Sequence, residues 1–269
     1  MKPFSRIYAL LAGLCGCLGL PSAWAQGQTY AVVVGIADYK ALTYQTGDLR
    51  YADQDARRVA AFLASRVGGQ VTPARLRLLT NEQATGAGIR SAMQLFTKAQ
   101  PTDRIVLYFS GHGLTDSFVP YDVRPDDPQS LLTYADIKGA FRASAAGVKL
   151  CIADACLSGN LTRPTRPPTN LTPKPVKTTR ITLPGTNVAM LLASRSTQMA
   201  VEDKQLLAGT FTYFLLKGLQ GEANRNGDNL LTIKELHDYV VPRVRKLSKG
   251  KQSPVFYGRF SDTLPLAYF

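Results

Sequence analysis

Two side chains capable of nucleophilic chemistry follow two apolar segments of the chain. His112 lies in a Ser-Gly-His-Gly motif after the segment 104–109, and Cys156 lies in an Asp-Ala-Cys-Leu-Ser-Gly motif after the segment 148–153. A thiolate attacks carbonyl carbons, whereas a thiol, with an ordinary pKa of about 8.5, does so poorly. An imidazole, with a pKa of about 6.5, exchanges protons near neutrality. We therefore interpret Cys156 as a nucleophile and His112 as its base.

The place of the two motifs in the expected fold supports this interpretation. Both apolar segments have the composition of central strands, and in open α/β sheets the carboxyl ends of the strands form the edge where sites are built. The amides of Gly113 and Cys156 would then point at a developing oxyanion, and the glycines beside His112 would let a substrate backbone approach. The alternative for either motif alone is a buried cysteine or a structural histidine in a glycine turn. The occurrence of both motifs, each at a strand end, favours catalysis.

These motifs resemble those of the caspase-like cysteine peptidases, specifically the bacterial metacaspase and orthocaspase branch. Cys156 lies 44 positions after His112, which fits a family in which the histidine precedes the cysteine by roughly 50 residues. The resemblance runs from about Thr29 to the carboxyl end and implies a three-layer α/β fold, a mainly parallel sheet with helices on both faces. Leu157 stands where metacaspases usually carry His, which leaves any auxiliary role of that position open.

The resemblance also implies a substrate pocket. Asp154 lies two residues before Cys156 and so on the same side of the strand. In metacaspases the Asp at that place lines the pocket for the residue preceding the scissile bond. The stretch 49–56 is similar to their Leu-Arg-Gly-Cys-Ile-Asn-Asp-Ala, which makes Asp55 the second pocket acid and puts Ala52 in place of a Cys.

Ser110 aligns with the pocket serine of that family. Two carboxylates without a fixed internal cation would favour Arg or Lys as the residue before the scissile bond, with Arg able to bind bidentately. The alternative is that Asp55 only favours the start of its helix and that Asp154 only caps local amides. The sequence thus predicts cleavage after Arg or Lys and not after Asp.

Residues 1–25 have the layout of a secretory signal peptide. Lys2 and Arg6 form a basic start, residues 7–20 an apolar run, and Ala23-Trp24-Ala25 a cleavage site before residue 26. The expected location is therefore periplasmic or secreted. A retained membrane anchor is the alternative, although the apolar run is short for a membrane span. No other stretch of the sequence is long and apolar enough to span a membrane.

The cysteines divide between the leader and the fold. Residues 14–17 loosely match a lipoprotein signal that would anchor the protein through Cys17, a further alternative to plain export. Cys151 and Cys156 are five residues apart, about 16 Å along an extended strand, which is beyond the reach of a disulfide. We therefore expect Cys151 to serve packing and Cys156 to be a free, reactive thiol.

The basic charge is confined to two segments. The formal net charge is +13, and residues 160–185 contribute five cations and residues 242–260 six, neither segment with an acid. No recognition motif or aromatic-basic stripe accompanies them, so we predict no nucleic-acid partner.

The remaining pattern predicts one catalytic domain in two portions. Residues 26–159 form the large portion, residues 160–186 a proline-rich basic linker, and residues 187–269 the small portion. Hydrophobic periodicity predicts strands and helices in alternation, with the segments listed here: strands 30–36, 75–79, 103–109, 148–153 and 187–194, and helices 48–66, 85–99, from 133, 209–219 and 232–247. The linker is either a plain solvated loop or a site of self-processing after one of its Arg or Lys residues.

One further motif resembles a calcium loop. Residues 224–235 place oxygen-bearing side chains at EF-hand spacing, but Asn stands at the first and the sixth positions, where Asp and Gly are expected. We interpret the segment as a turn leading into a capped helix. The sequence requires no cofactor and predicts no metal ligands; Ca²⁺ dependence stays open, with no site assigned. His237 is expected at the surface.

Together these features predict an exported cysteine endopeptidase that cleaves after Arg or Lys through a pair, His112 and Cys156, and an acyl-enzyme. Its partner would be a peptide or protein substrate. Two alternatives remain. One is a catalytically silent module of the same fold that binds partners in the cell envelope; the other is a basic envelope protein that binds anionic surfaces through its tail. The oligomeric state is not readable from the sequence.

Overall fold

A single six-stranded sheet organises the chain. The computed structural model describes residues 27–43, 47–114, 116–124, 126–155, 187–194 and 200–269. The strand order is β12-β8-β7-β3-β1-β2; all neighbours pair in parallel except β12 with β8. The six strands are β1 (Thr29–Gly35), β2 (Leu76–Thr80), β3 (Arg104–Gly111), β7 (Val148–Ala155), β8 (Asn187–Leu192) and β12 (Val255–Arg259). Runs of buried apolar residues mark its central strands, as expected for a sheet covered on both faces.

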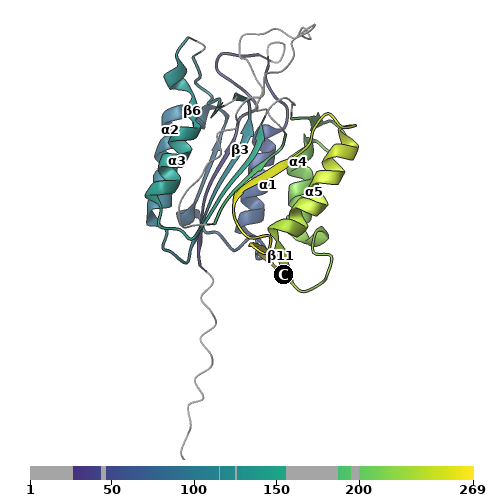
Figure 1. Cartoon of the computed structure of the whole chain (residues 1–269). Helices are drawn as coiled ribbons and strands as arrows, with labels where there is room; N and C mark the ends of the chain where they lie inside the picture. The colour runs from purple at the N-terminus through teal and green to yellow at the C-terminus, as the bar shows by residue number, and fades with distance from the viewer. Residues whose placement is uncertain (1–26, 44–46, 115, 125, 156–186, 195–199) are drawn as a thin grey trace, which may run out of the picture.

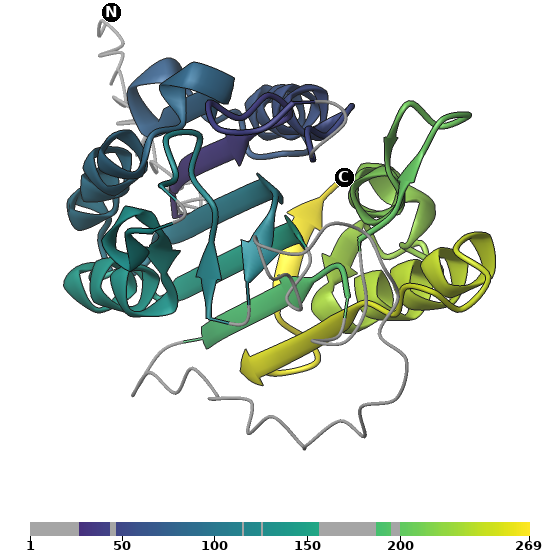
Figure 2. The same ribbon diagram turned by 90° about the horizontal axis from the view of Figure 1, so that it is seen from above.

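Helices cover both faces of this sheet and confirm the predicted α/β architecture (Figures 1 and 2). The α-helices among the described residues are α1 (Ala52–Ala64), α2 (Gly86–Met93), α3 (Tyr134–Ala143), α4 (Thr210–Lys217) and α5 (Ile233–Leu247). In Figure 1, α2 and α3 lie on one side of the sheet, and α1, α4 and α5 on the other. Each layer encloses its own buried apolar cluster against the sheet.

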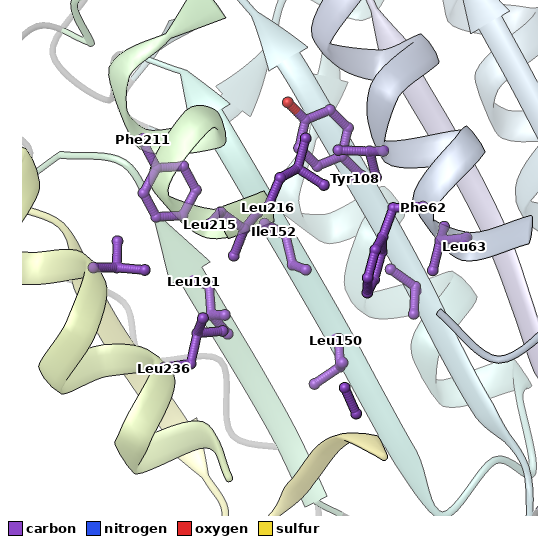
Figure 3. Packing of buried hydrophobic residues seen from close by; sticks show 14 of the residues in the cluster. Phe62, Leu63, Tyr108, Leu150, Ile152, Leu191, Phe211, Leu215, Leu216 and Leu236 are labelled. Carbon is purple, nitrogen blue, oxygen red and sulfur yellow. The ribbon is translucent and has the colours of Figure 1, made fainter. Parts of the chain in front are cut away.

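Alternation along the central strands divides the side chains between the two clusters. On β3, Ile105, Leu107 and Phe109 face α2 and α3, whereas Val106 and Tyr108 face the other layer. Figure 3 shows the second cluster, in which Phe62 and Leu63 of α1, Phe211, Leu215 and Leu216 of α4 and Leu236 of α5 pack over β3, β7 and β8. The oxygen of Tyr108 lies at one end of this cluster.

The helix starts follow from capping residues that the sequence announces. Thr133 and Asp136 form a complete capping box at α3, and Thr232 and Glu235 form one at α5, at the helix starts expected near residues 133 and 232. Glu235 is therefore engaged at the helix start, and its carboxylate accepts from the Thr232 amide and hydroxyl.

Two expected helix boundaries are wrong. The first helix begins at Ala52 and not at residue 48, because the Asp48 carboxylate accepts a hydrogen bond from the amide of Tyr39 in the preceding loop. The second helix ends at Met93 and continues only as a 3₁₀ segment, Gln94–Lys98. α5 contains Pro242 and ends at Leu247, the end that the sequence predicts.

Small elements surround the carboxyl end of the sheet. A three-stranded sheet is formed by β4 (Gly113–Leu114), β5 (Ser117–Phe118) and β6 (Leu132–Thr133), and a hairpin by β9 (Glu202–Asp203) and β10 (Ala208–Gly209). At the opposite end β11 (Leu230–Thr232) pairs with β13 (Pro265–Tyr268). There Arg104 at the start of β3 donates to the carbonyls of Leu266 and Pro265. The last strand is thus fixed to the main sheet.

Candidate active site

His112 lies just beyond the carboxyl end of β3, between the main sheet and β4. Its carbonyl accepts the amide of Val119 at 3.0 Å, and its own amide donates to the Tyr39 hydroxyl at 2.7 Å. The Tyr39 ring lies 5.0 Å from the imidazole, centroid to centroid, and is tilted by 37°. Both backbone groups of His112 are therefore fixed, and its ring has an aromatic neighbour.

A backbone carbonyl orients the imidazole. Nε2 of His112 is hydrogen-bonded to the carbonyl oxygen of Gly47. Because a carbonyl oxygen only accepts, Nε2 carries the proton in this contact, and Nδ1 is left as the basic nitrogen. The sequence indicated no Asp or Asn as a third catalytic group, and the group found here is a main-chain oxygen that side-chain patterns do not reveal.

The two predicted pocket acids come together at the start of α4. Asp55 and Asp154 are both buried. A Cβ placed on Gly209 would lie 2.3 Å from an oxygen of Asp154 and 3.1 Å from one of Asp55, so Gly209 passes between the two carboxylates. The Gly209 amide donates to Asp55 at 2.7 Å, and the Thr212 amide and hydroxyl donate to one oxygen of Asp154 at 3.1 and 2.8 Å. The acids thus cap a helix far from them in sequence.

Burial raises the pKa of both carboxyls. For Asp55 burial comes first and the neighbouring Asp154 charge second, and together they raise its pKa to about 8 against the opposing hydrogen bond from Gly209 and the charge of Arg58. For Asp154 burial raises the pKa to about 6, although hydrogen bonds from Thr212 oppose it. Two such close acids share protons, so near neutrality the pair carries less than its full charge.

Two charged residues that the sequence interpretation missed complete this cluster. Arg58, one turn along α1, donates to the second oxygen of Asp55 at 2.9 Å and to the carbonyl of Leu207 at 2.7 Å. The sequence argument assumed no fixed internal cation, and Arg58 corrects it. Glu202 on β9 accepts the amides of Arg50 and Tyr51 at 2.9–3.0 Å, and its charge also acts on Asp154.

Acidic side chains dominate this cluster. Asp55, Asp154 and Glu202 lie close together, and Arg58, whose side chain is 40% exposed, pairs with Asp55. The oxygen of Asp154 that does not bind Thr212 accepts no hydrogen bond from the described residues. Asp55 and Arg58 also line a cavity of about 570 Å³ between α1 and α4, to whose lining the hairpin contributes Leu206 and Ala208.

The remaining predicted site residues, Ser110, Ala52 and Gly113, lie at three different places near the carboxyl end of the sheet. Ser110 is buried, lies in register with Asp154 on the neighbouring strand, and interacts with the Tyr108 hydroxyl. Ala52 is buried at the start of α1, where its carbonyl oxygen would lie 2.3 Å from a Cβ on Gly35. Gly113 begins β4 directly after His112.

Several predictions fall outside the described residues. Cys156, its amide, the leader 1–25 and the whole linker 160–186 lie there, so the approach of His112 to Cys156 stays a prediction. Cys151 is confirmed as a packing residue: it is fully buried and free, and burial raises its pKa to about 12. Across the ranges that the structure covers, no group of three or more His, Cys, Asp or Glu is arranged to hold a metal. Nor do those ranges contain a helix that could cross a membrane.

The glycine before the histidine leaves room for Tyr39. A Cβ on Gly111 would lie 2.7 Å from the Tyr39 hydroxyl oxygen and 3.0 Å from the ring of Phe109. Such contacts are too short for any side chain. In the structure, the close approach at this glycine is therefore made by Tyr39.

Comparison with known proteins identifies the class to which this fold and site belong. The caspase domain family matches residues 28–264, and the chain belongs to that family. Among solved structures, the chain is similar to a protein of Geobacter sulfurreducens, with a TM-score of 0.61, 19% identity, and coverage of 87% of this chain and 95% of the other. That similarity concerns the fold alone. No curated protein matches the chain. Membership of the caspase domain family indicates a function of the cysteine-peptidase type.

Proposed function

We propose that the protein is a cysteine endopeptidase that cleaves after Arg or Lys, with His112 as the base and Cys156 as the nucleophile. The observation that carries the proposal is the placement of His112: the imidazole lies at the carboxyl edge of the sheet, and its Nε2 is bonded to the Gly47 carbonyl. Nδ1 is thereby left free to take a proton. Cys156 follows β7, the strand that pairs with β3.

The proposed reaction is an acyl transfer in two stages. Nδ1 of His112 takes the thiol proton, and the thiolate of Cys156 attacks the scissile carbonyl. The amides of Gly113 and Cys156 stabilise the oxyanion. Collapse expels the amine, which receives the proton from His112, and leaves an acyl-enzyme. Water, deprotonated by His112, then attacks the thioester and regenerates the thiol.

The acid cluster supports the choice of substrate. A guanidinium or ammonium group can bind the oxygen of Asp154 that accepts no hydrogen bond from the described residues, and the nearby charge of Glu202 favours a cation there. Asp55 contributes less negative charge near neutrality, because its pKa is raised to about 8 and Arg58 pairs with it. An acidic side chain in this site would face uncompensated like charges, so Asp-directed cleavage is disfavoured.

The test is active-site labelling with an arginyl chloromethylketone, with and without Ca²⁺. We expect alkylation at Cys156, its loss in His112→Ala and Cys156→Ala, and no alkylation at Cys151, whose buried thiol serves as the internal control. Fluorogenic peptides ending in Arg or Lys should be cleaved, and those ending in Asp should not. Equal turnover of Arg- and Asp-ended peptides would contradict the specificity. Absence of both labelling and turnover in either condition would favour the catalytically silent, partner-binding alternative.

Two further parts of the proposal rest on the sequence. The layout of residues 1–25 supports export to the periplasm or beyond, and the basic, proline-rich segment 160–186 supports self-processing after one of its Arg or Lys residues. Expression of the full chain and its Cys156→Ala variant tests both. We expect the leader to be removed in both proteins, and linker fragments to appear only in the wild type. Identical fragment patterns would exclude self-processing.

A further inference from the structure

Tyr39 is a buried tyrosine with two separate contacts to His112. It is 1% exposed and belongs to the apolar cluster beneath α2 and α3. Its hydroxyl oxygen accepts the main-chain amide of His112 at 2.7 Å, and its ring lies against the imidazole with centroids 5.0 Å apart. One side chain therefore touches both the backbone and the ring of the proposed base.

The surrounding chain leaves room for this contact. Gly111, immediately before His112, could not carry a Cβ, because that atom would lie 2.7 Å from the Tyr39 oxygen. A glycine at this position is thus the condition for the hydroxyl to reach the next amide. The amide at residue 112 lies beyond the paired part of β3, so no neighbouring strand of the main sheet satisfies it.

The loop that carries Tyr39 also carries Gly47, and one carboxylate closes it. Asp48 accepts the Tyr39 amide at 3.0 Å, and the Leu49 amide donates to Ala37 at 2.8 Å. These two bonds bring the ends of the loop together. The Gly47 carbonyl at Nε2 and the Tyr39 hydroxyl at the main chain are thereby held in one fixed frame.

We infer that Tyr39 is a positioning residue for His112, holding its backbone and ring in the orientation that presents Nε2 to the Gly47 carbonyl, with Asp48 closing the loop that makes both contacts. The inference deepens the proposed function and rests on it for its catalytic meaning. Its structural content, the orientation and tautomer of His112, can be tested without any activity.

This orientation selects one tautomer of the neutral His112 ring, with the proton on Nε2. When Nε2 donates to Gly47, the neutral ring must hold its lone pair at Nδ1, and only that nitrogen can accept a proton. If the ring turned or its backbone shifted, the two tautomers would mix and the base would be aimed away from its target. Small misplacements of a reacting group cost up to about a hundredfold in rate.

The experiment compares Tyr39→Phe with the wild-type chain. The substitution keeps the ring and removes only the hydroxyl. The matched control is Tyr134→Phe, because Tyr134 also has a buried hydroxyl, and this one has no hydrogen-bond partner among the described residues. The first measurement is the ¹⁵N spectrum of the imidazole nitrogens, in a chain that contains only two histidines, His112 and His237. The second is hydrogen exchange at the His112 amide, and the third is kcat and KM on an Arg-ended peptide.

We expect wild-type and Tyr134→Phe proteins to hold His112 protonated at Nε2 at neutral pH. Tyr39→Phe should show a mixture of tautomers and amide exchange faster by about tenfold, the effect of one lost hydrogen bond. Its kcat should fall about tenfold or more with KM unchanged. An unchanged tautomer and exchange rate in Tyr39→Phe would overturn the inference.

The two hypotheses fail in different ways. If the wild-type chain cleaves nothing but its His112 spectrum responds to Tyr39→Phe, the positioning role stands and the proposed peptidase function falls. If Tyr39→Phe does not fold, Asp48→Ala replaces it, because it opens the same loop from its outer end and should give the same tautomer mixture. A His112 spectrum identical to that of the wild type in folded Asp48→Ala would overturn the inference.

Discussion

At the scale of single residues, the site depends on groups held by the main chain. His112 is oriented by the carbonyl of Gly47, and the two acids are held by amides at the start of α4. Amides there carry the positive end of a helix dipole, which favours carboxylates. The same acids are buried and close to each other, which opposes their ionisation. The second effect dominates, so the pair retains protons at pH values where free carboxyls are charged.

This balance predicts an unusual dependence of stability on pH. The folded pKa values of about 8 for Asp55 and about 6 for Asp154 lie above the ordinary value of 3.8. The folded state therefore binds more protons than the unfolded state, and the contribution of the pair to the free energy of unfolding falls as pH rises from about 4 to about 8. We expect the Asp55→Asn variant to lose less stability than the wild type over that range, by roughly 1–3 kcal/mol.

Urea unfolding at pH 5 and pH 8.5 measures this difference. The control is Asp53→Asn, a change of the same type in the same first turn of α1, which should leave the pH dependence of the wild type in place. Equal pH dependence in Asp55→Asn and the wild type would mean that Asp55 ionises normally in the folded protein.

The sequence indicated several residues of the site, but it did not reveal the groups that hold them. The resemblance to caspase-like peptidases pointed to Asp55 and Asp154, and the structure brings these two carboxylates together. Gly47 was not predicted, since a carbonyl oxygen is common to every residue and its use depends on the fold. Arg58 was missed for a related reason: an arginine three residues after an aspartate in a helix is common, and only the buried setting makes it part of the site.

At the scale of elements, α4 starts without a cap of its own. Its N-cap residue is Gly209, which has no side chain to accept the first amides. Asp55 and Asp154 supply that acceptor from α1 and β7, and Thr212 adds a hydroxyl that bonds Asp154 at 2.8 Å and Tyr108 at 2.7 Å. The start of this helix is therefore a junction of three elements.

Two threonines in the first turn of α4 allow the contribution of this junction to stability to be measured apart from that of ordinary packing. Thr212→Val removes the hydroxyl shared by Asp154 and Tyr108, so each of these buried groups loses one hydrogen bond, and we expect a loss of about 1–3 kcal/mol in the free energy of unfolding. Thr210 is equally buried, but its hydroxyl has no partner among the described residues. Thr210→Val should therefore be neutral or slightly stabilising. Equal losses from the two substitutions, measured by urea unfolding, would show that the junction contributes nothing specific.

Long periodic elements were predicted well, and short ones were missed. The central strands and the two capping boxes were recognisable because buried runs and Thr-x-x-Asp or Thr-x-x-Glu spacing leave a local signal. The hairpin of β9 and β10 has only two residues in each strand, too few for a periodic pattern, and it is held by the distant contacts of Glu202 and Arg58. The helix start expected at residue 48 was wrong for the same reason. Asp48 bonds the amide of Tyr39 instead, and no periodic pattern reveals that contact.

At the scale of the whole molecule, the two portions on either side of the linker share one sheet and one core. β7 from the first portion pairs with β8 from the second over six residue pairs. The cluster in Figure 3 mixes side chains of α1 with those of α4 and α5. Arg104 adds a link between β3 and the last strand. Neither portion encloses its core without the other. The predicted boundaries at the linker therefore mark two segments of the sequence that fold as one unit.

This arrangement predicts that cutting the linker leaves the molecule assembled. A recognition sequence for a specific protease, placed between residues 165 and 180 in the Cys156→Ala chain, allows one defined cut. We expect both fragments to co-elute in gel filtration and to unfold in a single thermal transition, because the shared apolar core holds them together. Leu191→Ala, a truncation at a fully buried position of β8, should cost about 2–5 kcal/mol. The uncut variant should then remain folded with a lower melting temperature, while the cut variant separates into its fragments. Separation of the fragments in the cut parent protein would mean that the sheet and core alone do not hold the two portions together, and that the covalent linker is required.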